Sequence, residues 1–249
     1  MEIQILQLLD GAREARGLTV IIDVFRAFST ACYAYHSGAT KIIPVGNIDL
    51  AYRLKEQNPG SVLLGERNEQ KPEGFDFGNS PSQLVAEKIA GKTLVHTTSS
   101  GTQGIANATN AAEIITGSFV NAGAIVRYIH QQNPAVVSLV CMGYACEYPT
   151  DEDTLCAEWI KNELETPLNL PTMGGEKSKK FAEMVEIIRL GSGARFFDPE
   201  KQSWSPQADF GLCLNLNRFD FVLKVEKELK PHPTSPQGEE VLYLKKIDL

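Results

Sequence analysis

The chain has 249 residues, 43% of them hydrophobic, which is ordinary for a soluble globular protein of one large or two small domains and argues against a disordered chain. Its 31 acidic and 24 basic side chains give a net charge of −7, which argues against general nucleic-acid binding, because that needs clustered Lys and Arg. No apolar run is long enough to cross a bilayer, and the N-terminus lacks a basic start followed by an apolar core, so we expect a cytoplasmic protein with no membrane partner.

Up to about residue 165, short β-branched apolar runs alternate with helical stretches, which is the pattern of βαβ units and a parallel sheet. The expected strands are Ile3–Leu8, Leu18–Val24, Lys41–Val45, Val62–Gly65, Thr93–Thr97, Glu113–Gly117 and Val136–Cys141. The expected helices are Ala27–His36, Asp49–Gln57, Pro81–Ala90, Thr102–Thr109, Val120–His130 and Asp151–Glu165. We therefore predict a three-layer α/β/α main domain with a mostly parallel sheet over residues 1–165, whose polar loops after successive strands share one edge.

The C-terminal part begins after TPLNLPTMGGE, where two prolines and two glycines predict a linker over residues 166–176. Beyond it we expect a helix over Lys177–Leu190, strands over Phe219–Val225 and Val241–Lys246, and a loop between these strands at PHPTSPQGE. Because this part is small, residues 177–249 are predicted to form a C-terminal α+β subdomain packed on the first domain.

The stretch VLLGERNEQKPEGFDFGNSP, residues 62–81, is a short apolar strand followed by a charged loop. Glu66 and Arg67 lie at the strand end, and Asp76, Asn79 and Ser80 precede the next helix. In an open α/β sheet ligands bind outside the carboxyl ends of the strands, so this loop is a candidate site. The alternative is a solvated loop in which Asn79-Ser80-Pro81 starts the helix.

Polar side chains follow the other strands as well. They are Asp23 and Arg26, then Thr98, Ser100 and Gly101 of TTSSGT, then Ser118 and Asn121, then Glu152 and Asp153. Carboxylates without a nearby histidine suit Mg²⁺, arginines suit a phosphate or sulfonate, and the hydroxyls and N–H groups of TTSSGT suit an anion. Each has a structural alternative: a buried hydrogen bond for Asp23, a surface ion pair for Arg26, an ordinary helix cap for TTSSGT and a capped first turn for the acids at 151–153.

Several phosphate-handling motifs are absent from the sequence. There is no GxxxxGK[ST] loop and no GxGxxG after a strand, which argues against a P-loop protein and weakens a dinucleotide-binding interpretation. Neither Cys141 nor Cys146 is followed by Arg at the Cys-x5-Arg spacing, and Asp23 does not begin a DxDx[TV] motif. The common phosphatase families are therefore not indicated.

Five blocks of sequence nevertheless resemble the 2-phosphosulfolactate phosphatases, the ComB-like family, in order and spacing. They are IDVFRAFST (22–30), GERNEQKPEGFDFGNSP (65–81), GKTLVHTTSSGT (91–102), GSFVNA (117–122) and EDTLCA (152–157), and DFGLCLNLNRFDFV (209–222) extends the resemblance to the C-terminal part. The resemblance implies a Mg²⁺-dependent hydrolase of two-part α/β structure that removes phosphate from 2-phospho-3-sulfolactate, on the route to coenzyme M. It also places Asp23, Arg26, Glu66, Arg67, Asp76, Asn79, Ser80, Glu152 and Asp153 at family motif positions.

Two departures from the family pattern concern the substrate more than the chemistry. Ser100 stands where the family usually has an asparagine in TTNGT, which shortens the side chain and removes an amide donor. MGYACEYPTD replaces a Gly-rich, uncharged run before Glu152.

The leading hypothesis is a Mg²⁺-dependent phosphatase acting on a small acidic 2-phospho acid such as 2-phosphosulfolactate. The expected catalytic residues are Asp23, Arg26, Glu66 and Arg67, and the expected metal-binding residues are Asp23, Glu66, Glu152 and Asp153. The expected substrate-binding residues are Asp76, Asn79, Ser80, Thr98, Ser100, Gly101, Ser118 and Asn121. The alternatives are a non-catalytic binding protein for a phosphorylated or sulfonated acid and a scaffold domain, and the apolar face of Phe119–Ile129 suits burial inside the domain or in a homo-oligomer.

Overall fold

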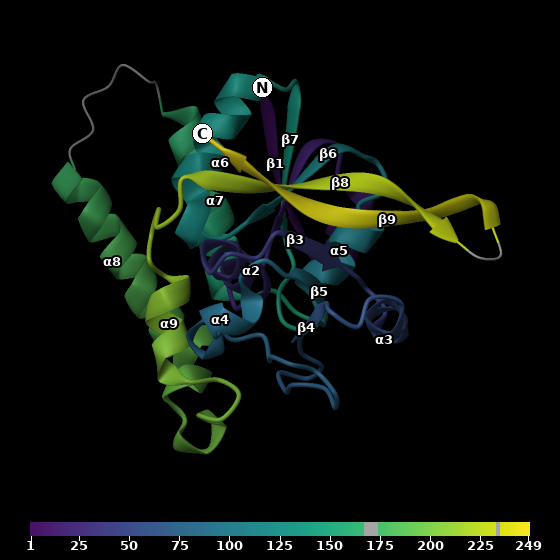
Figure 1. Cartoon of the computed structure of the whole chain (residues 1–249). Helices are drawn as coiled ribbons and strands as arrows, with labels where there is room; N and C mark the ends of the chain where they lie inside the picture. The colour runs from purple at the N-terminus through teal and green to yellow at the C-terminus, as the bar shows by residue number, and fades with distance from the viewer. Residues whose placement is uncertain (167–173, 233–234) are drawn as a thin grey trace.

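A nine-stranded sheet organises residues 1–166, 174–232 and 235–249, the part of the chain that the computed structural model describes (Figure 1). The strands are β1 (Glu2–Gln7), β2 (Gly17–Ile22), β3 (Lys41–Pro44), β4 (Val62–Gly65), β5 (Thr93–Thr97), β6 (Ala111–Gly117), β7 (Val136–Cys141), β8 (Phe221–His232) and β9 (Ser235–Asp248). The α-helices are α1 (Leu8–Glu14), α2 (Ala27–His36), α3 (Ile48–Gln57), α4 (Ala86–Ile89), α5 (Gly101–Asn107), α6 (Ala122–Gln132), α7 (Asp151–Glu165), α8 (Gly174–Leu190) and α9 (Gln207–Cys213). The short 3-10 helices are η1 (Pro81–Gln83), η2 (Phe119–Asn121), η3 (Ser192–Phe197) and η4 (Pro199–Lys201).

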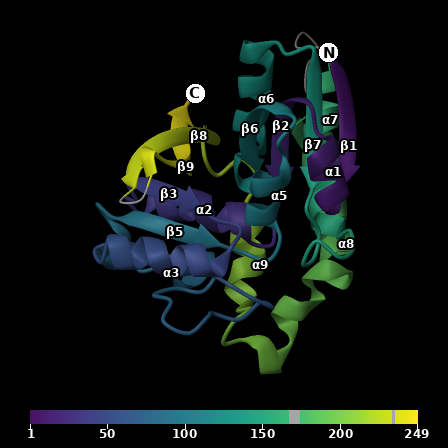
Figure 2. The same ribbon diagram turned by 90° about the vertical axis from the view of Figure 1, so that its right-hand side faces the viewer.

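The sheet has two parallel halves, in the overall order β1-β7-β2-β6-β8-β9-β3-β5-β4. Strands β1, β7, β2 and β6 are mutually parallel and form the first half; β3, β5 and β4 are mutually parallel and form the second half. The β8–β9 hairpin joins them through antiparallel pairing to β6, within itself and to β3. Three successive reversals mean that the second half runs opposite to the first, and Figure 2 shows β3 and β5 lying across the direction of β1 and β7.

Helices cover both faces of the first half. On one face, Phe119 and Ile125 pack in a core with Trp159 and Ile160 of α7. The other face packs against α1, α2 and α5, and α3 covers the second half. In β2 every residue except Gly17 is buried, as expected for a continuous apolar strand between two helix layers. The predicted three-layer α/β/α architecture with a mostly parallel sheet is confirmed.

One predicted helix, Pro81–Ala90, is wrong as a single element. It is divided into η1 and the short α4, because Leu84 and Val85 have extended backbone between them. The side chain of Leu84 packs on the core beneath. Tertiary contact here outweighs local helix propensity.

The C-terminal strands lie inside the common sheet. Strand β8 extends to His232 and β9 begins at Ser235, so most of the PHPTSPQGE stretch expected to be a loop lies within the two strands. His232 pairs with Ser235, and residues 233–234 are outside the described part. Cross-strand pairing there overrides a composition that favours turns. Residues 167–173 of the predicted linker also lie outside the described part, and α8 begins at Gly174, three residues before the expected start. The division into residues 1–165 and 177–249 stays a prediction.

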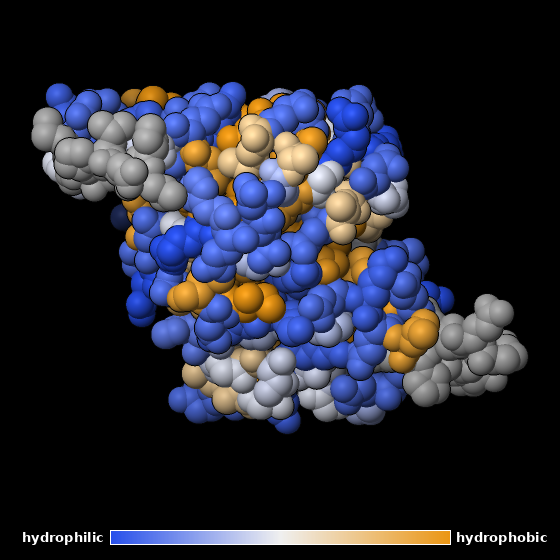
Figure 3. Space-filling view, turned by 90° about the horizontal axis from the view of Figure 1, so that it is seen from above, coloured by the Kyte–Doolittle hydropathy of each residue, from blue (hydrophilic) through white to orange (hydrophobic). Residues whose placement is uncertain are grey.

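The surface does not present one continuous apolar area on the face drawn in Figure 3, where hydrophilic residues surround separate apolar patches. The apolar side of η2 and α6 is turned inward, since Phe119, Ile125 and Ile129 are fully buried within the chain. Across the described helices, none is long and apolar enough to cross a membrane.

Candidate active site

Asp23 follows the end of β2 and is almost completely buried. Its Oδ1 accepts the backbone N–H of Ala27 at 2.9 Å, and its Oδ2 accepts the N–H of Gly101 at 2.8 Å. A Cβ on Gly101 would lie 2.8 Å from Asp23 Oδ2, so only glycine allows this approach. Asp23 thus joins the loop after β2 to the start of α5.

Glu66 follows β4 and binds the same segment, the TTSSGT loop, from the other side. Its Oε1 accepts the N–H of Ser99 at 2.6 Å, and its Oε2 accepts the Ser99 hydroxyl at 3.1 Å and the N–H of Glu69 at 2.9 Å. The TTSSGT loop therefore lies between Asp23 of the first half and Glu66 of the second half.

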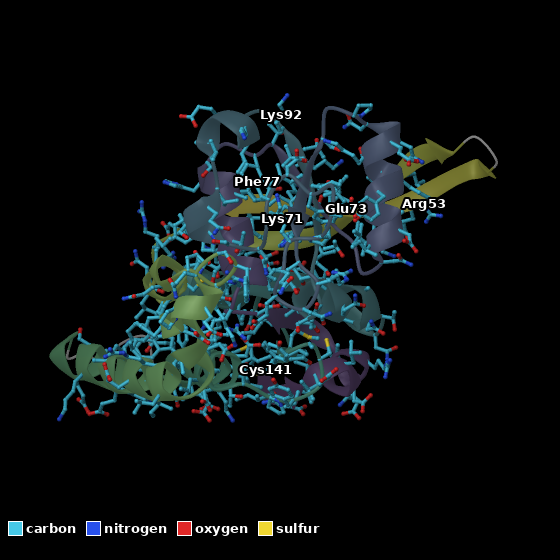
Figure 4. The ribbon with its side chains drawn as sticks, turned by 90° about the horizontal axis from the view of Figure 1, so that it is seen from below. Arg53, Lys71, Glu73, Phe77, Lys92 and Cys141 are labelled. Carbon is cyan, nitrogen blue, oxygen red and sulfur yellow. The ribbon has the colours of Figure 1, made fainter. Side chains whose placement is uncertain are left out.

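The prediction that the polar loops share one edge of the sheet is wrong. The two halves run in opposite directions, and their carboxyl ends meet because the strands of the second half lie across those of the first (Figure 2). Figure 4 shows Lys71 and Phe77, from the loop after β4, apart from Cys141, the last residue of β7. The site is thus formed between two halves, not along one row of strand ends.

Glu152 and Asp153 lie in the first turn of α7, and both are 2% exposed. Asp153 accepts the backbone N–H of Val24 at 2.8 Å through Oδ1 and that of Gly143 at 2.9 Å through Oδ2. Glu152 accepts the hydroxyl of Ser192. The bonds of Asp153 tie the loops after β2 and β7 to α7, and the bond of Glu152 ties η3 to it, so the two acids are not merely charges on a solvated first turn.

Arg26 is buried and forms an ion pair with the buried Asp209 of α9, with Nη1 and Oδ2 at 2.7 Å. The other oxygen of Asp209 accepts the N–H of Ser82 at 2.9 Å. Sequence reasoning did not single out Asp209, although it begins the DFGLCLNLNRFDFV block. The position of Asp209 at the start of this block, which extends the family resemblance, is the sequence signal that could have identified it.

Arg67 is turned toward the protein backbone. Its Nη2 donates to Gly46 O at 3.1 Å and to Thr97 Oγ1 at 2.7 Å, and its Nη1 donates to Glu66 O at 2.7 Å. Burial lowers the pKa of its guanidinium. The geometry fits a residue that holds the ends of β4 and β5 together.

Arg195, on η3, is a second site residue that sequence reasoning missed. Its Nη1 lies 3.0 Å from Glu69 Oε1, and its Nη2 donates to Phe25 O at 3.1 Å. Arg195 lies in an aromatic, Gly-rich stretch with no motif, so only the tertiary structure brings it to the site.

A cleft of about 420 Å³ of empty space, partly open to solvent, lies between these groups. Five of the predicted residues line it: Asp23, Arg26, Glu66, Asn79 and Ser100. Glu69, Tyr144 and Arg195 line it as well.

The other predicted residues lie behind the cleft wall or beside it. Two hold loops: Asp76 accepts the N–H of Leu63 at 2.8 Å, and the hydroxyls of Ser118 and Ser29 are 2.6 Å apart. The residues that do not line the cleft are Arg67, Asp76, Ser80, Thr98, Gly101, Ser118, Asn121, Glu152 and Asp153.

Comparison with known proteins gives a family for this chain. The family model described as 2-phosphosulpholactate phosphatase matches residues 4–228. The chain belongs to this family. A relative from Caldanaerobacter subterraneus subsp. tengcongensis is 33% identical over 215 residues, covering 83% of this chain and 87% of the relative. One from Bacillus subtilis is 31% identical, covering 85% and 88%, and one from Thermotoga petrophila is 39% identical, covering 68% and 71%.

Each of these three relatives is named a probable 2-phosphosulfolactate phosphatase. The resemblance inferred from the five sequence blocks is therefore confirmed. The matched region contains every cleft residue named above, including Arg195, and it also contains Asp209. This chain is thus a member of a phosphatase family in which the cleft is the candidate active site.

Buried carboxylates dominate the electrostatics of this family member's site. Burial, with added repulsion from Glu66 and Glu152, raises the pKa of Asp23 to about 7. Burial first, then the charges of Glu152 and Asp23, raises the pKa of Asp153 well above its usual value, and burial raises that of Glu152. Several carboxyl groups thus resist ionisation here, and a bound cation would favour their ionised form.

The fit of these groups to Mg²⁺ depends on how the ion is held. Within residues 1–166, 174–232 and 235–249, no group of three or more His, Cys, Asp or Glu side chains is placed to hold a metal ion. Mg²⁺ commonly uses only one or two carboxylates together with water and substrate phosphate. Asp23 and Glu66 both line the cleft, so they fit an ion site that the substrate completes.

Proposed function

We propose that this protein is a Mg²⁺-dependent phosphatase that hydrolyses the phosphate ester of a small acidic 2-phospho acid, foremost 2-phosphosulfolactate, to sulfolactate and phosphate. The observation that supports this most is the cleft, in which Asp23 and Glu66 from the two halves of the sheet face the same space as Arg26 and Arg195. Carboxylates for a cation beside arginines for an anion are the combination that phosphoryl transfer needs.

Asp23 and Glu66 are the side chains that would hold the ion, and backbone N–H groups fix the orientation of both carboxylates. When bound, Mg²⁺ would neutralise phosphate oxygens and favour in-line attack by water. Asp153 keeps the loops after β2 and β7 in place, and Glu152 holds Ser192 of η3, so we assign both an orienting role behind the cleft wall.

Arg26 would neutralise the non-bridging oxygens of the phosphate. Its ion pair with Asp209 holds the guanidinium in one position, so little reorganisation is needed when the ester binds. Ser100 and Asn79 line the same space and supply polar contacts. Arg67 would act indirectly, because its donors already hold Gly46, Thr97 and Glu66.

A place on the route to coenzyme M, in the cytoplasm, goes with this substrate and is part of the proposal. Its support is the family to which the chain belongs. The departures from the family pattern at Ser100 and in MGYACEYPTD concern the identity of this substrate, because both segments line the cleft. The second does so through Gly143, Tyr144 and Ala145.

The test is phosphate release from racemic 2-phosphosulfolactate with Mg²⁺ and with EDTA, for wild type, Asp23→Asn and Arg26→Ala. Asp10→Asn is the matched control, because Asp10 is an exposed carboxylate paired with Arg13 on the surface. We expect metal-dependent release that Asp10→Asn retains and the two cleft variants lose.

No release from 2-phosphosulfolactate, phospholactate or phosphoglycolate by the folded protein would contradict the proposal. If the protein then bound these acids without turnover, the non-catalytic binding protein would replace it. Release that EDTA leaves unchanged would contradict the metal requirement alone.

A further inference from the structure

The two arginines that line the cleft are held in different ways. Arg26 is 3% exposed and its partner Asp209 is fully buried, and Asp209 is itself fixed by the N–H of Ser82. Separating this pair would leave a buried charge alone, which is strongly unfavourable. Arg26 therefore keeps its partner whether or not a ligand is present.

Arg195 instead pairs with a residue of an exposed turn. The side chains of Arg195 and Glu69 are 14% and 16% exposed, and they lie 3.0 Å apart at the cleft. Asn68 and Glu69 both have positive φ, in a tight turn closed by backbone bonds between Arg67 and Gln70. Such a pair is more easily exchanged for another anion than the buried Arg26–Asp209 pair.

The guanidinium of Arg195 is held ready for an anion even without Glu69. Its carbon lies 5.2 Å from the ring centre of Phe196, 5.6 Å from that of Tyr144 and 5.9 Å from that of Phe25. Its Nη2 is bonded to Phe25 O, directly before Arg26 in the chain, which fixes the spacing of the two arginines. Its buried Nε has no hydrogen-bond partner among the described residues, so a donor is left unused.

We propose that Arg195 binds the second acid group of the substrate, a sulfonate or carboxylate, and that Glu69 is the counter-ion displaced when this group enters. The inference rests on the proposed phosphatase function and assigns the residues that select, among phosphate monoesters, those with a further acid group. Arg26 receives the phosphate end, and Arg195 decides which esters are accepted. Arg67 does not line the cleft and donates to the backbone and Thr97, so it has no part in this selection.

The first test compares two substrates. Phosphate release is measured from 2-phosphosulfolactate and from glycerol 2-phosphate, which has the ester but no second acid group, for wild type and Arg195→Gln. We expect kcat/KM of the variant to fall about 30- to 100-fold on 2-phosphosulfolactate, because hydrogen bonds to a charged group are lost. On glycerol 2-phosphate the factor by which kcat/KM falls should be at least ten times smaller. Equal losses on both substrates would overturn the proposal, since they would indicate a structural effect.

The second variant, Glu69→Gln, is expected to improve activity on 2-phosphosulfolactate where Arg195→Gln lowers it. Glu69→Gln removes the competing carboxylate, so KM for 2-phosphosulfolactate is expected to fall severalfold, whereas loss of a merely structural ion pair would lower activity in both variants. Arg127→Gln is the matched control, because Arg127 is an exposed arginine paired with Asp220 away from the cleft. A rise in KM for Glu69→Gln would count against displacement.

A binding measurement separates this inference from the proposed function. Sulfolactate, which has no phosphate to lose, is titrated calorimetrically into wild type and Arg195→Gln. Binding that weakens about 30-fold or more in the variant supports the role of Arg195 even if no substrate is hydrolysed. Equal binding by the two proteins, or none by wild type, overturns it while leaving the phosphatase assignment to its own assay.

Discussion

The two halves of the sheet contribute to the cleft in different ways. The first half supplies Asp23, and Asp153 of α7 accepts the N–H of the next residue, Val24. Asp23 and Asp153 each accept two backbone N–H bonds and are at most 4% exposed. The second half supplies Glu66 and, four residues after β4, the turn residue Glu69, which pairs with Arg195 at the rim. Both halves thus contribute a buried carboxylate held by backbone N–H groups, Asp23 or Glu66, but only the second half adds a rim charge, Glu69, that can be exchanged.

Asp209 connects Arg26, after β2, with Ser82, after β4, so its removal should have the largest effect on stability. Asp209→Ala leaves Arg26 buried without its partner and frees the N–H of Ser82, so we expect the free energy of unfolding to fall by about 3–5 kcal/mol. Urea denaturation measures this. Asp220→Ala, which breaks the exposed pair with Arg127, serves as the control and should cost less than about 1 kcal/mol. Similar losses for both variants would mean that Arg26 is not anchored as described.

Substitution of Asp23, the buried carboxylate that the first half contributes to the cleft, tests the proposed metal site most directly. Asp23→Asn keeps the size of the side chain but removes the charge proposed to hold Mg²⁺ and one of the two acceptors of backbone N–H. We expect kcat on 2-phosphosulfolactate to fall about a hundredfold or more, as for loss of a well-placed electrostatic stabiliser. Steady-state kinetics at saturating Mg²⁺ measure this. A variant with near wild-type kcat would remove Asp23 from the mechanism.

Gly101 allows Asp23 to approach α5, so a substitution there tests how exactly Asp23 must be placed. In Gly101→Ala the new Cβ would lie 2.8 Å from Asp23 Oδ2 and 2.9 Å from Ala27 Cβ, so Asp23 must move, and activity should fall about tenfold, the effect of a small misplacement in the site. The matched control is Gly211→Ala in α9, where nothing lies within 4 Å of the new Cβ. Unchanged kinetics in Gly101→Ala would show that the position of Asp23 is not critical.

The pH dependence of stability gives the smallest effect. The pKa of Asp23 is raised to about 7, so between about pH 4 and 7 the folded protein keeps a proton that the unfolded chain has lost. Stability without metal therefore falls as pH rises through this range, and the same sign holds for Glu152 and Asp153. We expect Tm in EDTA to be lower at pH 8 than at pH 5.5 by about 3 °C or more.

Two comparisons check the cause of this slope. Mg²⁺ binds the ionised carboxylates, so the rise in Tm that it produces should grow with pH. Asp23→Asn should flatten the EDTA slope, because the substituted side chain does not titrate. A slope that is identical in the variant would assign the pH dependence to other groups.

Most strands and helices of the first 165 residues could be predicted from the sequence alone, and so could five of the residues that line the cleft. Strands such as β2 and β7 are continuous apolar runs, and a buried strand is specified by those residues alone. Asp23, Arg26 and Glu66 follow strand ends within a few residues, and Asn79 lies in the motif at the end of the loop after β4, so their role as candidates could be predicted from order and spacing. Their convergence could be predicted as well, although not its geometry.

How the two halves meet and which charges pair depend on contacts between segments that are distant in the sequence. The position of β8 and β9 in the middle of the sheet depends on pairing with β6 and β3, more than 100 residues earlier in the chain, and their antiparallel direction reverses the second half. Asp209 and Arg195 reach Arg26 and Glu69 across similar separations in sequence. No local propensity encodes such contacts, because each is stabilised only when the burial and packing of distant segments have brought its partners together.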